Sequence, residues 1–321
     1  MPFASIKKID KIEIHPNADS LVIAKLGGWN CIVKKNQFQE GELVCFIETD
    51  VVLPEKNWSA FYRSKSSRTK AIKLRSIFSE GIVEKLQTVE YTGPIEEGRD
   101  ISNDIGVIKF EPPIPRELNA KGLLPLGILK TDEERFQNLE KLPIGESYDA
   151  TLKLDGTSFS CYYKDENNFG VCGRTLEYKL DCINNYTVIE KKYDIINKLR
   201  EFNRKHGVAI CLRGEIFGGG VQKGKHNPHS QLPLDVAFFS VWLIDERRYA
   251  RKGDEFYFIN VCAELGLPTV PLLESGIFEE SIIKKYSEDL TQIDGKNFEG
   301  VVVNTSSDSF KIINKYYDSL K

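Results

Sequence analysis

The chain of 321 residues has few of the features that mark secreted or membrane proteins. Its seven cysteines are scattered, with no Cys-x-x-Cys pair. An odd and dispersed set favours reduced thiols over a disulfide framework or a structural zinc site. No apolar run approaches the roughly 20 residues that a membrane-spanning helix needs, and the first residues lack the apolar stretch of a signal peptide. We therefore expect an intracellular, cytoplasmic protein without a membrane contact.

The chain also lacks the excess of positive charge that is typical of nucleic-acid-binding proteins, since its formal net charge is −3. One stretch, residues 61–79, nevertheless contains no acidic residue. Its basic residues are Arg63, Lys65, Arg68, Lys70, Lys73 and Arg75. Such a stretch can follow the phosphates of a nucleic acid, and a solvated basic loop is an equally good alternative. We treat these six residues as candidate nucleic-acid contacts.

The hydrophobic pattern divides the chain into two parts, with a stiff, proline-rich join at residues 111–115. Residues 1–112 hold short β-type runs separated by turn formers, which is typical of a small barrel. These runs are residues 20–26, 31–34, 43–48, 71–78 and 81–85. In residues 113–321 apolar strands alternate with helices. The sequence thus predicts an α+β protein, with a barrel followed by a domain of mostly antiparallel sheets and flanking helices.

Individual elements of the second part can be predicted from the same periodicity. Strands are expected at residues 151–154, 159–163, 209–212, 237–244 and 300–303. Helices are expected at residues 181–206, 256–265 and 279–290. A further helix should begin at Thr131, with Glu134 as its capping-box partner.

Residues 153–158 read Lys-Leu-Asp-Gly-Thr-Ser. Lys153 ends an apolar strand and Gly156 opens a turn, so the amine and the Asp155 carboxylate should point to the same side of the chain. An amine must be neutral to attack phosphorus, which requires desolvation or a nearby positive charge to lower its pKa. Taken alone, the hexapeptide is more simply explained as an exposed Lys-Asp turn.

Three downstream residues give the hexapeptide its significance. Glu215 ends an apolar run and is placed to accept a ribose hydroxyl, while Glu299 precedes another run and is placed to hold metal-bound water beside Asp155. Lys311 is placed to reach an α-phosphate. Each residue alone is compatible with ordinary solvation at the edge of a strand. Their occurrence in this order predicts one nucleotide-binding site.

In this order the segments resemble the covalent nucleotidyltransferase superfamily, which contains polynucleotide ligases and RNA-capping enzymes. Residues 153–158 match its nucleophile motif K-x-D-G-x-S. The later motifs are represented by Arg174, Gly214-Glu215, Phe239, Glu299-Gly300-Val301-Val302 and Lys311. The superfamily often has a second lysine two residues after the last of these, where this chain has Ile313. Lys315 stands four residues after Lys311, and the second lysine role stays open.

Three features narrow the resemblance to RNA ligase family five, whose members seal nicks with RNA on the 3′-OH strand. The first is the barrel-like N-terminal part, which resembles an OB domain. The second is the segment of residues 130–138, and the third is the segment of residues 73–83. The resemblance implies three phosphoryl transfers, assisted by Mg²⁺ or Mn²⁺. Lys153 takes AMP from ATP, AMP passes to a 5′-phosphate, and a 3′-OH displaces AMP. The implied substrate is nicked duplex RNA or another RNA-containing nucleic acid, in RNA repair, with no obligate protein partner.

The resemblance also implies roles for the site residues. Phe239 would stack on adenine, and Glu215 and Arg174 would contact the ribose. Lys311, with Lys315, would bind phosphate, and Arg135 would touch the departing phosphates. Asp155 and Glu299 would hold the metal, through water. Gly156 and Val301 complete the expected nucleotide contacts.

Other functions were weighed against an RNA ligase. A DNA ligase or a capping guanylyltransferase typically carries its OB domain after the last motif, but only residues 312–321 follow Lys311. A non-enzymatic tRNA-binding OB protein would explain residues 14–21 and leave the second part unexplained. His226 and His229 suggest a metal site, but no third ligand is near them in the sequence, so a polar loop is the better interpretation.

Overall fold

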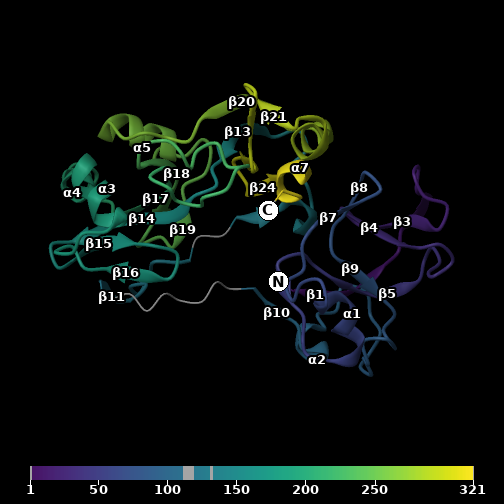
Figure 1. The fold of residues 1–321 in the computed structure, drawn as a ribbon. Coiled ribbons are helices and arrows are strands. Elements are labelled where there is room, and N and C mark those ends of the chain that lie inside the picture. Colours follow the sequence, from purple (N-terminus) through teal and green to yellow (C-terminus); the bar gives the residue numbers. More distant parts are fainter. Residues whose placement is uncertain (1, 111–118, 131–132, 321) are drawn as a thin grey trace. The chain divides into compact units, whose positions relative to one another are not determined.

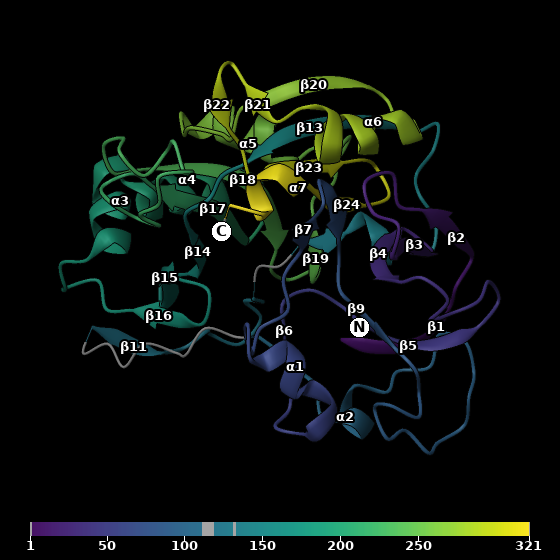
Figure 2. The same cartoon turned by 45° about the vertical axis from the view of Figure 1, so that its right-hand side comes forward.

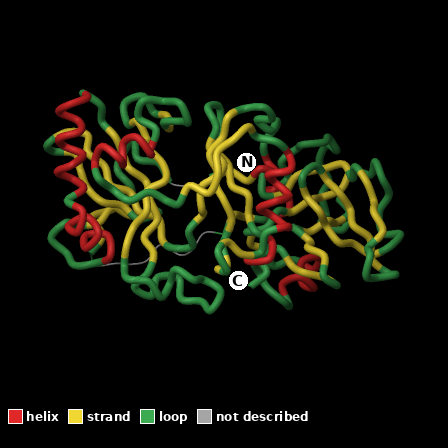
Figure 3. Tube along the Cα trace, turned by 90° about the horizontal axis from the view of Figure 1, so that it is seen from above, coloured by secondary structure: helices red, strands yellow, loops and turns green. Residues whose placement is uncertain are grey.

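The computed structural model describes residues 2–110, 119–130 and 133–320. The chain folds as two compact units, Met1–Pro113 and Ile114–Lys321 (Figure 1). The proline-rich join predicted at residues 111–115 lies outside the described residues. Strands outnumber helices in both units (Figure 3). Among the described residues, no helix is long and apolar enough to cross a membrane.

The first unit is built from two three-stranded antiparallel sheets. One has the order β1 (Ala4–Lys8), β5 (Leu43–Ile47), β9 (Ile82–Glu84), and the other the order β2 (Lys11–Ile14), β3 (Leu21–Leu26), β4 (Trp29–Lys34). Strand β5 is buried on both faces, because Cys45 and Ile47 enter one apolar cluster while Val44 and Phe46 enter another. Alternating side chains of a central strand thereby connect the two sheets through a closed core.

Smaller elements complete this unit. They are β6 (Val51–Val52) paired with β10 (Ile108–Lys109), β7 (Ile72–Leu74) paired with β8 (Ile77–Ser79), and the short helices η1 (Asn57–Ser59), α1 (Ala60–Arg63) and α2 (Ser102–Ile105). The single strand predicted at residues 71–78 is therefore wrong. Arg75 and Ser76 have φ values of 47° and 72°, which turn the chain into a hairpin. Positive φ at both central residues is the geometry that a tight hairpin turn requires.

The second unit contains a seven-stranded and a five-stranded sheet (Figure 2). In spatial order, the seven strands are β11 (Ala120–Leu123), β16 (Leu176–Tyr178), β15 (Asn168–Cys172), β14 (Thr157–Asp165), β17 (Ile210–Phe217), β18 (Asp235–Leu243) and β19 (Arg248–Tyr249). The five are β12 (Glu134–Arg135), β24 (Ser309–Ile313), β23 (Gly300–Asn304), β13 (Ser147–Lys153) and β20 (Leu272–Ile277). A short hairpin joins β21 (Gln292–Ile293) and β22 (Lys296–Asn297). Only β12 and β24 pair in parallel among the described strands, so the predicted α+β architecture with mostly antiparallel sheets is confirmed.

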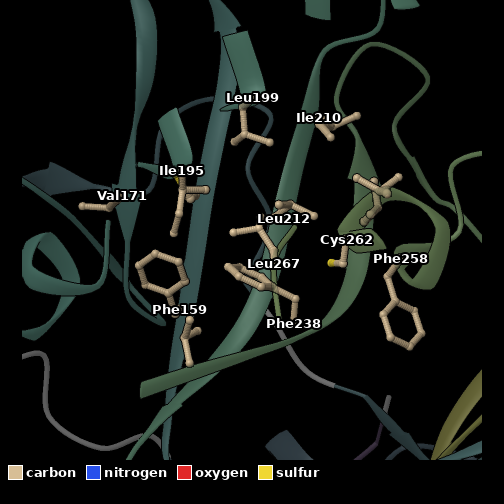
Figure 4. Close-up of a cluster of buried hydrophobic side chains, with 14 of the residues drawn as sticks. Phe159, Val171, Ile195, Leu199, Ile210, Leu212, Phe238, Phe258, Cys262 and Leu267 are labelled. Carbon is tan, nitrogen blue, oxygen red and sulfur yellow. The ribbon is translucent and has the colours of Figure 1, made fainter. Parts of the chain in front are cut away.

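Helices α3 (Asn185–Tyr193), α4 (Ile195–His206) and α5 (Phe258–Leu265) pack on one face of the seven-stranded sheet. Figure 4 shows this core, where Leu199 and Cys262 from the helices approach Phe159, Leu212 and Phe238 from the strands. Because side chains alternate along a strand, the residues between these apolar positions lie on the opposite face of the sheet.

Two of the predicted helices differ from the structure. Residues 181–206 form two helices, because Asp194 adopts a left-handed conformation with φ 53° between them. Residues 279–290 form the short α6 (Glu280–Lys284), followed by the π-helical turn η3 (Lys285–Asp289).

The helix predicted to start at Thr131 is also wrong in the part that can be seen. Thr131 lies outside the described residues, whereas Glu134 begins β12 and pairs with Phe310 of β24. Pairing in the sheet satisfies the backbone groups that the capping box would have satisfied. The 3₁₀ turn η2 (Phe136–Asn138) follows. A short helix, α7 (Lys315–Asp318), ends the described part of the chain.

Candidate active site

Lys153 is the last residue of β13, where it pairs with Gly300 of β23, which in turn pairs with Ile313 of β24. The alternate residues of these strands, including Ala150 and Val301, are buried in the core of this sheet. Lys153 therefore lies on the opposite face. A Cβ atom at position 300 would overlap the carbonyl oxygen of Ile312, so only glycine fits this close approach beside Lys153.

Three carboxylates surround the Lys153 amine. Its Nζ lies 2.6 Å from Glu299 Oε2. Burial alone would lower the pKa of Lys153, but the negative charges of Glu299, Glu215 and Asp155 act in the other direction, and the net effect raises it. Without a further cation, the amine is therefore held in its protonated, non-nucleophilic form.

Glu215 brings the seven-stranded sheet into the same site. It lies on β17, and burial raises its pKa to about 8, with Lys153 opposing this rise and Glu299 and Asp155 adding to it. The backbone N–H of Gly156 donates a hydrogen bond to Glu215 Oε1 at 3.2 Å. A Cβ atom at position 156 would overlap the carbonyl oxygen of Ile216, so the turn after Lys153 needs a glycine to lie this close to β17.

Asp155 is held from two directions. The hydroxyl of Tyr317, on α7, donates to Asp155 Oδ2 at 2.8 Å. The side-chain amide of Asn227 donates to the backbone carbonyl of Asp155 at 2.9 Å. The carboxylate that follows Lys153 is thus fixed by segments that are far from it in the sequence.

The fit of this site to a divalent cation depends on its carboxylates. No cluster of three His, Cys, Asp or Glu side chains with the geometry of a metal site occurs among the described residues. Glu215 is mostly protonated at neutral pH because its pKa is raised to about 8, but the Asp155 and Glu299 carboxylates still outnumber the single lysine. Mg²⁺ keeps several of its waters in most protein sites, so carboxylates can hold it through water. The Asp155 and Glu299 pair fits such an ion.

His226 and His229 lie in the segment between β17 and β18, and both rings pack against aromatic side chains. The His226 ring packs against Tyr317 with 5.1 Å between the ring centroids, and the His229 ring packs against Phe217 at 6.1 Å. Burial and the charge of Lys296 lower the pKa of His229, and the charge of Asp155 opposes this shift. The interpretation of this segment as a polar loop stays a prediction.

A row of residues crosses the five-stranded sheet on the face that carries Lys153. Arg135 pairs with Lys311, and Lys311 pairs with Val302. Val302 then pairs with Thr151, two residues before Lys153. Paired side chains lie on the same face of a sheet, so two cations and one apolar side chain flank the lysine.

Val301 does not lie on this face. Its side chain is 0% exposed and belongs to the core on the other side of the sheet, so the expected nucleotide contact through this side chain is wrong. Val302 is the residue on the ligand face. Alternation along the strand shows that the two valines lie on opposite faces, but only the pairing with β13 shows which of them shares the face of Lys153.

Phe239 occupies a β-bulge. Arg213 of β17 pairs with Ser240 and Gly214 pairs with Phe238, so Phe239 is the extra residue on β18. Phe238 is fully buried in the helix-covered core, whereas Phe239 is half-buried. A bulge of this kind redirects a side chain and is frequent beside active sites.

Arg174, Lys315 and Ile313 lie in three different segments of the second unit. Arg174 is half-buried in the connection between β15 and β16. Lys315 starts α7, and its Nζ lies 2.8 Å from Glu288 Oε1. Ile313, which stands where the superfamily often has a lysine, lies in the same row as Gly300 and Lys153.

Sequence reasoning missed a buried cation and its neighbouring carboxylate. Arg213 is 0% exposed and lies on β17 two residues before Glu215, on the same face. Its guanidinium lies 5.4 Å from the centroid of the Tyr249 ring. Burial raises the pKa of Glu133, while the hydroxyl of Ser309, which donates to it at 2.9 Å, and the charges of Arg251, Lys311 and Arg213 oppose that rise.

The basic stretch of the first unit is only partly exposed. Arg63 forms an ion pair with Glu55 at 2.5 Å, and Arg68 forms one with Asp50 at 2.7 Å. Four of the six cations, which are Lys65, Lys70, Lys73 and Arg75, are exposed to solvent. Only these four remain good candidates for contacts to phosphates.

A barrel unit joined to a two-sheet unit, with a lysine between carboxylates at a strand end, is the architecture of an enzyme that acts on nucleotides. The RNA ligase family profile matches residues 146–317, and an OB-fold domain profile matches residues 3–86. The first of these covers more than half of the chain, so the protein belongs to the RNA ligase family. It is an enzyme that ligates RNA, and its first unit is an OB-fold.

Solved structures of an RNA ligase from Naegleria gruberi are similar to nearly the whole chain. The ligase with PPi is 25% identical, with 99% of this chain and 98% of that chain covered and a TM-score of 0.83. An apo variant is also 25% identical, with 99% and 98% covered and a TM-score of 0.84. A variant with AMP and Mn is 24% identical, with 98% of each chain covered and a TM-score of 0.82, and shares the fold. A search of curated proteins found no match.

These matches favour the RNA ligase hypothesis over the alternatives. The family profile and these similar solved structures are those of RNA ligases, not of DNA ligases or capping enzymes. A tRNA-binding protein without enzymatic activity does not explain the match over residues 146–317.

Proposed function

We propose that the protein is an ATP-dependent RNA ligase that seals nicks between a 3′-OH and a 5′-phosphate, with RNA on the 3′-OH strand. The observation that carries the proposal is the Lys153 amine, at a strand end among three carboxylates and on the same sheet face as Lys311 and Arg135. The structures of the Naegleria gruberi ligase with ATP and Mn, and with AMP and Mn, support the nucleotide and the metal.

In the first step, Lys153 Nζ forms a bond to the α-phosphorus of ATP, and the bond to the pyrophosphate oxygen breaks. The amine must first lose a proton, and Glu299, at 2.6 Å, is the nearest acceptor. A divalent cation would neutralise the surplus of carboxylate charge and withdraw charge from the phosphates. Lys311 and Arg135 would bind the phosphates, since both lie on the face of Lys153.

The nucleoside would lie between the two sheets of the second unit. Phe239, redirected by its bulge, would stack on one side of adenine, and Val302 would contact it from the five-stranded sheet. Glu215 and Arg174 would bind the ribose. Gly156, which leaves no side chain above β17, would let the nucleotide approach the turn after Lys153.

AMP would then pass from Lys153 to the RNA 5′-phosphate, and attack by the 3′-OH would release AMP. We assign residues 1–112 to nucleic-acid binding and residues 113–321 to adenylylation. The exposed cations Lys65, Lys70, Lys73 and Arg75 support the first assignment, because Lys and Arg side chains bind the phosphate backbone regardless of sequence.

Covalent labelling tests the proposal. Protein incubated with a divalent metal and α-labelled ATP should become labelled, whereas Lys153→Met should not. Lys164→Met is a matched control, because Lys164 also faces a carboxylate, Asp245 at 3.7 Å, but is exposed and remote from the carboxylate cluster. Label that persists in Lys153→Met, or no label with ATP, would contradict the proposal. Label from GTP alone would instead support a capping enzyme.

Strand preference is tested separately, with nicked duplexes that differ only at the 3′-OH side. RNA at this position should be sealed and DNA sealed poorly. Equal sealing of both would contradict the assignment to an RNA-specific ligase.

A further inference from the structure

The C-terminal helix α7 contacts both carboxylate-bearing segments that flank Lys153. Tyr317, which is 1% exposed, donates its hydroxyl to Asp155 Oδ2 at 2.8 Å. This hydrogen bond joins two segments that are 162 positions apart in the sequence. Burial and this bond to Asp155 raise the pKa of Tyr317, so the hydroxyl keeps its proton and acts as a donor.

The start of α7 is fixed to the segment that carries Glu299. Asn314 is fully buried, and its backbone N–H donates to the carbonyl of Glu299 at 3.0 Å. Its side-chain amide donates to the carbonyl of Phe298 at 3.1 Å, and its side-chain oxygen accepts from the backbone N–H of Tyr316 at 3.0 Å. The position of the Tyr317 hydroxyl is therefore set relative to the backbone of Glu299.

The Tyr317 ring is also held from the side. The ring of His226 packs edge-on against it, with 5.1 Å between centroids, and the next residue, Asn227, donates to the backbone carbonyl of Asp155. Tyr317 is thus held by its helix and by His226, and its hydroxyl is one of the groups that orient the Asp155 carboxylate.

A different orientation of the Asp155 carboxylate would impair the proposed reaction. Asp155 already interacts electrostatically with Lys153. Without the Tyr317 hydroxyl, this carboxylate would lose a contact that orients it. It would also no longer be oriented to share a hydrated cation with Glu299.

We propose that Tyr317 is a positioning residue, whose hydroxyl holds Asp155 in the orientation in which it acts with Glu299 on a hydrated divalent cation. The inference rests on the proposed lysine adenylylation. A tyrosine that only filled space in the core would serve equally well as phenylalanine, so the two roles can be separated.

Tyr317→Phe tests the proposal, with Tyr193→Phe as the matched control. Tyr193 makes a comparable hydrogen bond, to Asp235 Oδ1 at 2.7 Å, outside the site. The rate of labelling from α-labelled ATP is measured against Mn²⁺ concentration. Loss of a group that orients a metal-binding residue typically costs 10–100-fold, so the half-saturating Mn²⁺ concentration of Tyr317→Phe should rise at least about tenfold. The control should match the wild type.

An unchanged metal dependence in Tyr317→Phe would overturn the proposal, because a structural role alone would lower the melting temperature and leave metal dependence intact. A double-variant comparison adds a test that does not rely on the single variant. If Tyr317 acts through Asp155, then Asp155→Asn and the double variant should have the same labelling rate, whereas multiplied losses would refute this route.

The experiment also separates this inference from the proposed function. If the wild type is not labelled, or if Lys153→Met is still labelled, the proposed function itself is refuted. A labelled wild type together with an unaffected Tyr317→Phe removes only the role of Tyr317.

Discussion

Glu215→Gln tests the electrostatics of the site without any nucleotide. Burial raises the pKa of Glu215 to about 8, from an ordinary value of 4.5. A carboxyl whose pKa is higher in the folded than in the unfolded protein stabilises the fold at low pH. That contribution is complete below about pH 4.5 and is lost as the pH rises through about 8. Glutamine has nearly the shape of the protonated acid and does not titrate.

The size of the effect follows from the two pKa values. Each pH unit between them is worth 1.36 kcal/mol, so the wild type should lose at most about 5 kcal/mol of unfolding free energy between pH 4.5 and 8 because of Glu215. The variant should not have this loss. Its stability should be close to that of the wild type near pH 4.5, exceed it increasingly up to about pH 8, and keep that difference at pH 9.

The assay is urea unfolding at several pH values. Unfolding is monitored through hydrogen exchange of the β17 amides, so that only the second unit is observed. Glu264→Gln is a control of opposite sign, because hydrogen bonds from His206 and Lys205 lower the pKa of Glu264. Its stability relative to the wild type should fall as the pH rises above the lowered pKa. A Glu215→Gln effect that is constant with pH, or that destabilises the protein at pH 9, would refute the reasoning.

Three further predictions concern the nucleotide and the nucleic acid. Phe239→Ala should raise the KM for ATP in the labelling reaction about tenfold, since stacking on a base is worth about 1–3 kcal/mol. Phe239→Tyr, which keeps an aromatic ring, should leave this KM unchanged. A KM for Phe239→Ala equal to that of the wild type would exclude stacking. The Lys73→Ala, Arg75→Ala double variant should bind nicked RNA with a salt dependence reduced by about one phosphate contact for each cation removed, and an unchanged slope would place these residues outside the interface. Residues 114–321 alone should label at Lys153 but seal nicks poorly; loss of labelling would show that adenylylation needs the OB-fold.

The alternating pattern of apolar residues predicts most of the strands of the second unit, because each sheet has one buried face. Turns without glycine or proline were the main source of error. Asp194 breaks a helix and Arg75 with Ser76 makes a hairpin, and all three adopt positive φ. Such conformations are uncommon in residues with a side chain, so local sequence rules favour a continuous element.

The motif residues at strand ends were predictable because their chemistry and their order are both in the sequence. The supporting contacts were not. Tyr317 lies 162 positions from Asp155, and the bulge at Phe239 depends on the pairing of β17 with β18. Periodicity reports which face a residue occupies but not which distant segment covers it.

Ile313 stands where the superfamily often has a second lysine, and this difference affects the charge around Lys153. It lies in one row with Gly300 and Lys153, on the face where Lys311 and Arg135 supply the cations. A lysine at this position would add positive charge near the amine and would lower its pKa. With isoleucine there, the three carboxylates raise the pKa of Lys153, and a cation from solution has to offset them. A divalent cation held by Asp155 and Glu299 would offset these charges, so the proposed first step should depend on how these two carboxylates are oriented.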